Sequence, residues 1–270
     1  MILADLHTHT KVSHGVASAE EMYAAARDAG LEYLGISEHS PLPPGFSCRL
    51  YQEHFERDFP ALCDEVLALK QRGGSPQVLL GIELDWIPSN LPYMRELLAS
   101  KPFDYVIGSL HFLGEMSIGF NANWDCPVEE AFRRFEAYYM AMAEMARSGL
   151  VHIASHPDFI KLHCFDLFQE WLYQPMSRLP IMEAMQALRQ NNVLLEVSSA
   201  GLRQPFCEPY PGPMIMDIAA REDVRIMLAS DAHRTEDVAG QFDELARYAR
   251  SYGYRESGIV VGGERRFLPF

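Results

Sequence analysis

The chain has 270 residues, a formal net charge of −14 and a hydrophobic content of 48%. This composition excludes a disordered chain, and the acidic balance argues against a nucleic-acid partner, for which a basic surface is usual. Taken alone, the charge also argues against an anionic substrate. The length fits one large α/β domain or two small ones, and an α/β barrel of roughly 250 residues is the first candidate.

No segment has the length and apolarity of a membrane span, which needs about 18 residues. The N-terminal residues also lack the basic and apolar regions of a secretory signal. The five cysteines are scattered and form no CxxC pair, which favours free thiols in a reducing compartment. We therefore expect a cytoplasmic protein without a membrane partner.

Short apolar runs alternate with amphipathic patterns along the chain, and no linker interrupts the alternation, so we predict a single domain over residues 1–270. The predicted strands span residues 2–7, 33–39, 77–84, 104–111, 151–156, 193–199 and 224–233, with a short one at 258–261. The predicted helices span residues 18–29, 50–71, 91–100, 128–148, 177–191, 214–222 and 235–252. This pattern, with near-continuous apolar strands, is typical of a parallel sheet covered by helices.

Local signals refine several of these boundaries. Ser18 and Glu21 form a capping box at the start of the first helix. Pro60 is expected to kink or split the helix around it, and Thr235 is expected to cap the last helix. Residues 112–127 are expected to form a long irregular loop, which is either a lid over the substrate or an ordinary surface loop.

Side chains that bind metal ions stand at the ends of six predicted strands. They are His7 and His9, His39, Glu83, His111, His156, and Asp231 with His233, while His14 follows in the loop after the first strand. The carboxyl ends of parallel strands open on one face of a barrel, and residues two apart in a strand point the same way. The pattern predicts a metal centre at that face, with imidazole and carboxylate ligands that suit zinc, iron or manganese. Paired metals are a recurring device in phosphate-ester hydrolysis.

Six short motifs follow one another between residues 4 and 240. They read D-L-H-T-H-T at 5–10, G-I-S-E-H-S at 35–40, G-I-E at 81–83, G-S-L-H at 108–111, H-P-D at 156–158 and S-D-A-H at 230–233. In order and spacing they resemble the polymerase and histidinol phosphatase (PHP) superfamily. The resemblance implies a distorted (β/α)7, TIM-like barrel with three divalent metal ions at the carboxyl ends of the strands. It implies a first ion bound by His7, His9, Glu83 and Asp231, a second by Glu83, His111 and His156, and a third by His14, His39 and His233.

Three further motifs, H-P-D-F-I-K at 156–161, S-S-A-G-L-R at 198–203 and E-P-Y-P at 208–211, resemble the histidinol-phosphatase branch of this superfamily. That branch typically has Gly-His-x-Asp-Leu-Ile-Lys, Asn-Thr-Ser-Gly-x-Arg and Tyr-Pro, so the chain departs from it at Ser155, at Phe159 and over 197–200. The resemblance implies a phosphoric monoester hydrolase that converts L-histidinol phosphate into L-histidinol and inorganic phosphate in histidine biosynthesis.

We hypothesise that a hydroxide bridging two metal ions attacks the phosphorus atom, because bound cations lower the pKa of water. Arg203 is the first choice for bidentate phosphate binding, and Lys161 is the second cation. Asp231 is a candidate to protonate the leaving alcohol, as is a metal-bound water. The imidazole and ammonium groups of the substrate need anionic or aromatic partners, and the candidates are Glu115, Phe120, Asp158, Glu196 and Tyr210.

Two other functions fit the sequence. The chain could hydrolyse another small phosphomonoester or trim nucleotide ends, although the acidic balance and the lack of a basic–aromatic stripe disfavour a nuclease. It could also be a non-catalytic, metal-binding accessory domain, which the complete ligand set and the lack of a visible second domain disfavour.

Overall fold

Seven parallel strands form the central sheet in the computed structural model, which describes residues 1–270. In sheet order they are β1 (Ala4–Asp5), β2 (Tyr33–Ile36), β3 (Gln77–Asp85), β4 (Tyr105–Ser109), β7 (Ile153–Ala154), β8 (Leu194–Ser198) and β9 (Ile226–Ala229). Each coincides with a predicted strand, and every neighbouring pair is parallel. This sequential order is the one expected of repeated strand–helix units.

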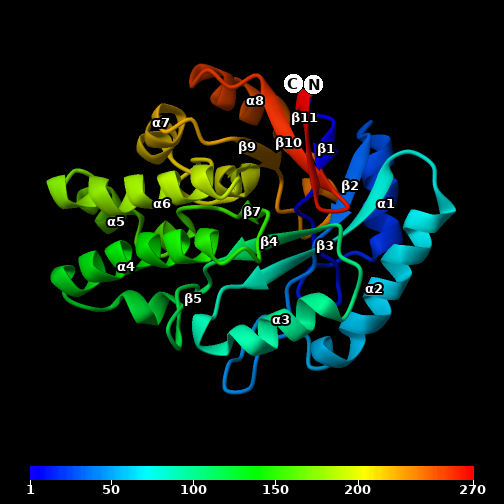
Figure 1. Cartoon of the computed structure of the whole chain (residues 1–270), viewed down its shortest axis with the longest axis horizontal. Coiled ribbons are helices and arrows are strands. Elements are labelled where there is room, and N and C mark those ends of the chain that lie inside the picture. The colour runs from blue at the N-terminus through cyan, green and yellow to red at the C-terminus, as the bar shows by residue number, and fades with distance from the viewer.

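The sheet is curled (Figure 1), and the segments that follow its first and last strands meet just beyond the carboxyl ends of those strands. A parallel bridge joins Thr8 to Ala232, and the His9 amide donates a 2.8 Å hydrogen bond to the Ala232 carbonyl. β1 and β9 themselves are not paired, so the closure is partial and the barrel is distorted. The predicted seven-stranded, TIM-like barrel is confirmed.

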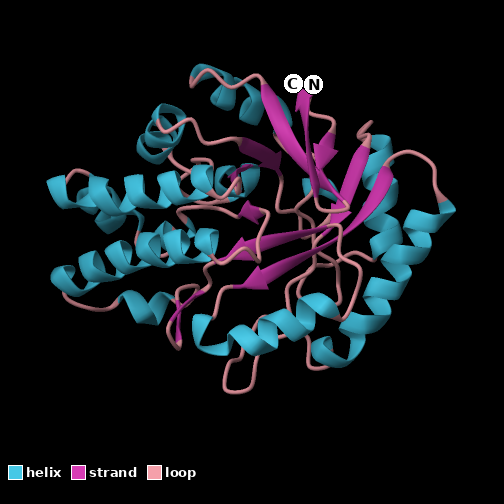
Figure 2. Cartoon of the chain, in the orientation of Figure 1, coloured by secondary structure: helices cyan, strands magenta, loops and turns pink.

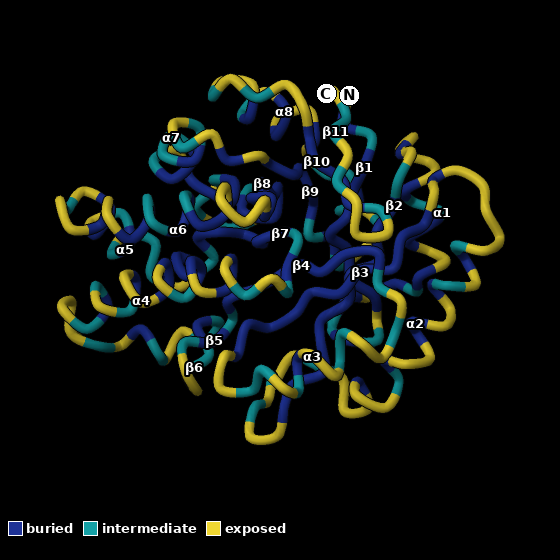
Figure 3. Tube along the Cα trace, viewed as in Figure 1, coloured by how far each residue is buried: buried dark blue, intermediate teal, exposed yellow.

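Helices cover the outside of the sheet (Figure 2). They are α1 (Ala19–Asp28), α2 (Phe55–Arg72), α3 (Leu91–Ala99), α4 (Val128–Arg147), α5 (Phe165–Leu172), α6 (Arg178–Gln190), α7 (Pro213–Arg221) and α8 (Phe242–Ser251). Figure 3 shows the strands almost entirely buried and the helices buried along one side, where a hydrophobic cluster of 60 buried residues lies. None of the helices combines the length and apolarity that crossing a membrane requires.

A smaller core fills the inside of the barrel. Tyr105 projects into it, and its hydroxyl donates a 2.6 Å hydrogen bond to the Leu6 carbonyl. A Cβ atom at Gly35 would lie 1.8 Å from the Tyr105 side chain, and one at Gly81 would lie 2.3 Å from it. Both positions therefore require glycine, because the tyrosine occupies the space in which their side chains would stand.

An antiparallel hairpin closes the amino-terminal end of the barrel. It consists of β10 (Glu256–Val261), predicted as a short strand, and β11 (Glu264–Pro269), which the sequence did not indicate. Ile259 and Val260 of the hairpin pack into the inner core. Asp104, directly before β4, holds the turn of the hairpin by accepting a 3.1 Å hydrogen bond from the Gly262 amide.

Pro60 does not split α2, which runs unbroken through it. The proline lies in the second turn of the helix and there removes only one backbone hydrogen bond. Residues 112–127 are not an irregular loop. They contain a hairpin of β5 (Phe112–Leu113) and β6 (Met116–Ser117), followed by a 3₁₀ turn over Asn121–Trp124.

The last helix was predicted to begin at Thr235, but it begins at Phe242. Thr235 instead starts a short 3₁₀ turn, after which Ala239 and Gln241 adopt left-handed φ angles of 54° and 58°. The Ala239 amide donates a 3.0 Å hydrogen bond to the buried Asp5 carboxylate. This contact with the barrel overrides the local helical pattern. The predicted capping box of Ser18 is confirmed.

Candidate metal centre

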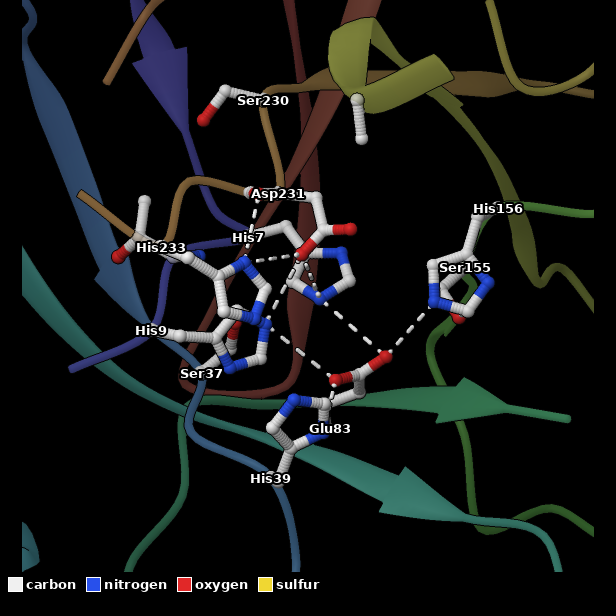
Figure 4. Close-up of polar contacts among 12 residues, drawn as sticks. His7, His9, Ser37, His39, Glu83, Ser155, His156, Ser230, Asp231 and His233 are labelled. Atoms are coloured by element: carbon white, nitrogen blue, oxygen red, sulfur yellow. Dashed lines mark hydrogen bonds and ion pairs between the residues drawn. The ribbon is translucent and has the colours of Figure 1, made fainter. Parts of the chain in front are cut away.

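The side chains predicted as metal ligands converge at the carboxyl ends of the strands, and Figure 4 shows the central part of this cluster. Glu83 lies within β3, and the other ligands follow β1, β2, β4, β7 and β9. We call this the metal cluster, and its members are His7, His9, His14, His39, Glu83, His111, His156, Asp231 and His233.

Glu83 lies at the centre of the metal cluster and is buried. Imidazole nitrogens surround both of its carboxylate oxygens, at 3.5 Å for His7, 3.5 Å for His9, 2.7 Å for His39, 3.6 Å for His111 and 3.0 Å for His156. The Ser109 hydroxyl also donates to Oε1 at 2.6 Å. This is the environment expected of a carboxylate that bridges two ions.

Asp231 approaches the same histidines from β9. Its Oδ1 lies 3.2 Å from His9 Nε2 and 3.6 Å from His7 Nε2. Asp231 has a left-handed φ of 52°, which is strained for a residue other than glycine. Arg203 holds this strained segment, because its Nη2 donates to the carbonyls of Ser230 and Asp231 at 2.9 and 3.0 Å.

The remaining histidines form a stack at the edge of the cluster. The Nε2 atoms of His14 and His39 are 2.8 Å apart. The ring of His233 stacks on that of His14 and on that of His9, with centroids 4.3 Å apart in both cases. Neutral imidazole nitrogens that gather at such short range are the commonest protein ligands of metal ions.

Several buried polar atoms of the metal cluster have no hydrogen-bond partner. They are His7 Nε2, His9 Nε2, His39 Nδ1, Glu83 Oε2 and His233 Nε2. His39 Nδ1 and Glu83 Oε2 are 2.7 Å apart but are not aligned as a hydrogen bond. A buried polar atom without a partner costs about 1–3 kcal/mol, so five in one place fit side chains that serve as ligands of a bound group.

Three triads within the cluster bring their ligand atoms within 4.8 Å of one another. They are His7–His9–Glu83, His9–His39–His233 and His39–Glu83–His111. The first lies within the set predicted for the first ion. The other two share His39, which links the sets predicted for the second and third ions. Together with the unpartnered atoms, the triads show that the residues present fit divalent metal ions.

Burial and neighbouring charges shift the pKa values of these side chains. Burial and the charge of neighbouring His39 lower the pKa of His14 to about 3, and burial lowers that of His39 to about 4. Burial opposes protonation of His9 as well, but the neighbouring carboxylates of Asp231 and Glu38 outweigh it and raise the pKa to about 9. The carboxylates thus create a negative field at the centre that bound cations would neutralise.

Carboxylates outside the cluster bind the Nδ1 atoms of three of its histidines. The bonds are 2.9 Å from His7 Nδ1 to Glu196, 3.2 Å from His9 Nδ1 to Glu38 and 2.9 Å from His111 Nδ1 to Asp85. Each leaves Nε2 directed to the centre, which is the usual arrangement of metal-binding histidines. Glu38 and Asp85 were not predicted as functional residues. A signal existed for Asp85, which lies two residues after Glu83 and so faces the same side of β3.

A cavity of about 370 Å³ opens onto the metal cluster. Its lining includes two cations, Arg203 and Arg234, and one carboxylate outside the cluster, Asp237. Asp237 lies 3.6 Å from Arg203 and 3.8 Å from Arg234. The aromatic part of the lining is formed by Tyr51, Phe112, Phe120 and Phe159. The cavity therefore has groups for an anion and for a flat apolar group.

Arg203 lines the cavity as predicted, but Lys161 does not. The Lys161 side chain is fully buried. Its ammonium donates to Asp158 at 2.8 Å, to Glu208 at 2.6 Å and to the Pro209 carbonyl at 3.2 Å. These bonds use all three protons, so Lys161 fixes the segment that contains Glu208 and does not reach the cavity.

Of the other predicted substrate contacts, one lines the cavity and the rest do not. Phe120 lines the cavity, whereas Glu115 is exposed and lines an adjoining hollow on the other side of Phe120. Glu196 is buried and binds His7, so it holds a ligand and does not face the cavity. Tyr210 is buried behind the metal cluster, with its ring 6.2 Å from that of His156. Asp158 is likewise buried and bound to Lys161.

Comparison with known proteins agrees with this geometry. Residues 5–200 match the PHP domain, and the chain belongs to this family. It is 29% identical over 273 residues to a Deinococcus radiodurans protein named probable histidinol-phosphatase, with 99% of each chain covered. It is 25% identical over 271 residues to the histidinol-phosphatase of Bacillus subtilis, with 88% of this chain and 96% of that protein covered.

The fold is similar to that of a histidinol phosphate phosphatase from Lactococcus lactis, whose crystal structure contains zinc, L-histidinol and phosphate. The TM-score is 0.76 at 19% identity, with 97% of this chain and 98% of that chain covered. The predicted family, the predicted barrel and the predicted enzyme class, a phosphoric monoester hydrolase, are confirmed.

Proposed function

We propose that this protein is a metal-dependent phosphatase that hydrolyses L-histidinol phosphate to L-histidinol and inorganic phosphate, in the cytoplasm and for histidine biosynthesis. The observation that carries the proposal is the metal cluster beneath a cavity that has both cationic and aromatic lining residues. The names of the relatives at 29% and 25% identity support the substrate. The zinc, L-histidinol and phosphate of the Lactococcus lactis structure support the substrate and the need for divalent metal.

Three divalent ions, of zinc, iron or manganese, are part of this proposal. His7, His9, Glu83 and Asp231 would hold the first, Glu83, His111 and His156 the second, and His14, His39 and His233 the third. Ions bound there would lower the pKa of a coordinated water and neutralise charge on the phosphate oxygens. Asp231 is the proposed residue that accepts a proton from the attacking water and returns it to the oxygen of the leaving alcohol.

Arg203 is the proposed phosphate ligand. Its Nη2 is held by backbone carbonyls, while its other contacts are long, at 3.5 Å to Ser199 and 3.6 Å to Asp237. Nη1 and Nε of Arg203 can therefore donate to a phosphate oxygen, and a planar guanidinium matches phosphate geometry. Arg234 adds a second positive charge, so the three charged residues of the lining outside the metal cluster carry a net charge of about +1.

The alcohol part of the substrate would occupy the aromatic part of the cavity. Tyr51, Phe120 and Phe159 offer ring faces and edges to an imidazole. Asp237 is the one lining carboxylate outside the metal cluster, and we assign it to the ammonium group. Asp237 could not be predicted from the sequence, because its position after the last metal-ligand motif resembles that of any surface aspartate.

The enzyme class is tested by measuring bound metal and the release of inorganic phosphate on the same preparations. Metal-loaded protein should release phosphate from L-histidinol phosphate, and Glu83→Gln should lose both metal and activity. Glu144→Gln, a change on the exposed face of α4, is the matched control and should keep both. Bound metal without phosphate release would favour the accessory domain. Faster release from a 3′-phosphorylated nucleotide would favour a nuclease-like function.

A further inference from the structure

A second cavity, of about 400 Å³, lies at the end of the barrel opposite the metal cluster. Leu194, the first residue of β8, and Arg225, directly before β9, both line it, whereas the metal ligands lie at the carboxyl ends of the strands. Three arginines face this cavity from separate elements. They are Arg189 at the end of α6, Arg225, and Arg265 on β11.

Arg265 is an arginine without a partner. Its side chain is partly buried, and it makes no hydrogen bond and no ion pair with any residue of the chain. Its Nε is fully shielded from solvent and unpaired, and burial lowers the pKa of the guanidinium. Charged groups that leave water are normally paired. The chain supplies no such partner to Arg265, whose shielded Nε is left with an unused proton.

The neighbouring charges do not supply it either. Asp223 lies 3.8 Å from Arg189 and Glu256 lies 3.6 Å from Arg225, and all four side chains are largely exposed. Even with both carboxylates counted, three positive charges face two negative ones. This local excess occurs in a chain whose net charge is −14. Phe267 fixes the plane of Arg225, whose guanidinium lies 3.7 Å from the ring centroid.

We propose that this cavity binds a small oxyanion of the phosphate type, held by Arg265, Arg225 and Arg189. Guanidinium groups on different elements can each donate paired hydrogen bonds to such an anion, and the side-chain amide of Asn192 adds a further donor. The site is remote from the metal cluster and does not depend on the proposed function. The protein then has two separate places for phosphate.

The first test is calorimetric titration of the full-length, metal-loaded protein with inorganic phosphate. The wild type should show two classes of site, one at the metal cluster and one at the arginine cavity. Arg265→Met should lose one class and retain the other. Arg266→Met, which removes an exposed charge from the adjacent position of β11, should retain both. If Arg265→Met retained every class of site that the wild type shows, the proposal would be overturned, whether or not the metal cluster binds phosphate.

Thermal unfolding gives a second readout that separates binding from folding. In phosphate-free buffer, Arg265→Met should melt at the same temperature as the wild type or higher, because it removes an unpaired charge. Phosphate should raise the Tm of the wild type and of Arg266→Met by more than it raises the Tm of Arg265→Met. Equal shifts in all three proteins would contradict the site.

Discussion

Glu196 shows how strongly the metal cluster depends on a residue that is not itself a ligand. Its carboxylate is fully buried and binds His7 Nδ1 through both oxygens, at 2.9 and 3.0 Å. It also accepts a 3.2 Å hydrogen bond from the backbone amide of His156. One side chain on β8 thereby orients ligands that follow β1 and β7.

Replacing this carboxylate should weaken metal binding without removing a ligand. We expect Glu196→Gln to lower the metal affinity about 10- to 100-fold, because the amide cannot accept from His7 and His156 with both of its terminal atoms. The affinity is measured by competition with a chelator, and Glu144→Gln should leave it unchanged. A wild-type affinity in Glu196→Gln would show that His7 does not need this support.

Arg203 should affect catalysis more than metal content. Because it is the proposed phosphate ligand, Arg203→Ala should lower kcat/KM for L-histidinol phosphate by about 10- to 100-fold, which corresponds to the loss of one charge-assisted hydrogen bond. Metal content, measured by elemental analysis, should remain that of the wild type. If kcat/KM is unchanged, the phosphate role of Arg203 is wrong; if metal is lost, its bond to the Asp231 carbonyl is its main function.

The cysteines should differ in reactivity according to burial. Burial raises the pKa of the Cys63 and Cys164 thiols to about 12, whereas Cys207 is exposed. Only a thiolate attacks a disulfide reagent, so at pH 8 the folded protein should react rapidly at Cys207 and not at Cys63 or Cys164. Titration with an aromatic disulfide checks this. The fast phase should vanish in Cys207→Ser, and rapid labelling of Cys63 would contradict the burial argument.

The β10–β11 hairpin is held against the amino-terminal end of the barrel by one carboxylate. Asp104 anchors it, because this one carboxylate accepts from Lys70, from the Leu80 amide and from the Gly262 amide. Its partners therefore come from α2, β3 and the hairpin turn. Closing the barrel end in this way covers Ile259 and Val260.

Removing the charge of Asp104 should loosen this end of the barrel. We expect Asp104→Asn to lower the free energy of unfolding by about 2 kcal/mol, since hydrogen bonds to a charged group contribute about 1.5–3 kcal/mol each and asparagine retains some of them. Denaturant unfolding measures the change. The matched control is Asp64→Asn, which breaks an exposed pair with Lys101 and should cost less than about 1 kcal/mol. Equal losses in the two variants would show that Asp104 has no special role.

The ends of the strands could be predicted from the sequence, whereas the partners of buried charges could not. Glu83 and the histidines were predicted because parallel strands bring their carboxyl ends to one face, whatever the details of packing. The environment of Lys161 was not predictable, because its partner Glu208 lies 47 residues away and nothing local pairs the two. β11 was not predicted for a similar reason. Glu264, Arg265 and Arg266 make its sequence polar, and it forms a strand because it pairs with β10.

At the scale of the whole molecule, the net charge of −14 describes the surface better than the cavity. Part of the negative charge belongs to Glu83 and Asp231, which are proposed to bind cations. Three divalent ions would bring about six positive charges to the centre. With Arg203 and Arg234 in the lining, the cavity can attract a phosphate ester despite the acidic composition. The prediction of a single domain over residues 1–270 stays a prediction.

Metal removal should destabilise the folded chain as a whole. Ions that bind only the folded state add to its stability, and the unpartnered atoms of the cluster have no substitute for them. A chelator should therefore lower the Tm of the wild type by several degrees, and readdition of zinc or manganese should restore it. Glu83→Gln should show little response to the chelator. An unchanged Tm in the wild type would mean that the cluster does not couple metal binding to folding.

The ratio of kcat/KM for L-histidinol phosphate to kcat/KM for p-nitrophenyl phosphate, measured on the metal-loaded protein, tests the proposed substrate most directly. The p-nitrophenyl ester has the better leaving group but lacks the imidazole and the ammonium that the aromatic lining and Asp237 are proposed to bind. We predict a ratio of about 100 or more in favour of L-histidinol phosphate. A ratio near one, or in favour of p-nitrophenyl phosphate, would contradict the assignment of this cavity to histidinol phosphate.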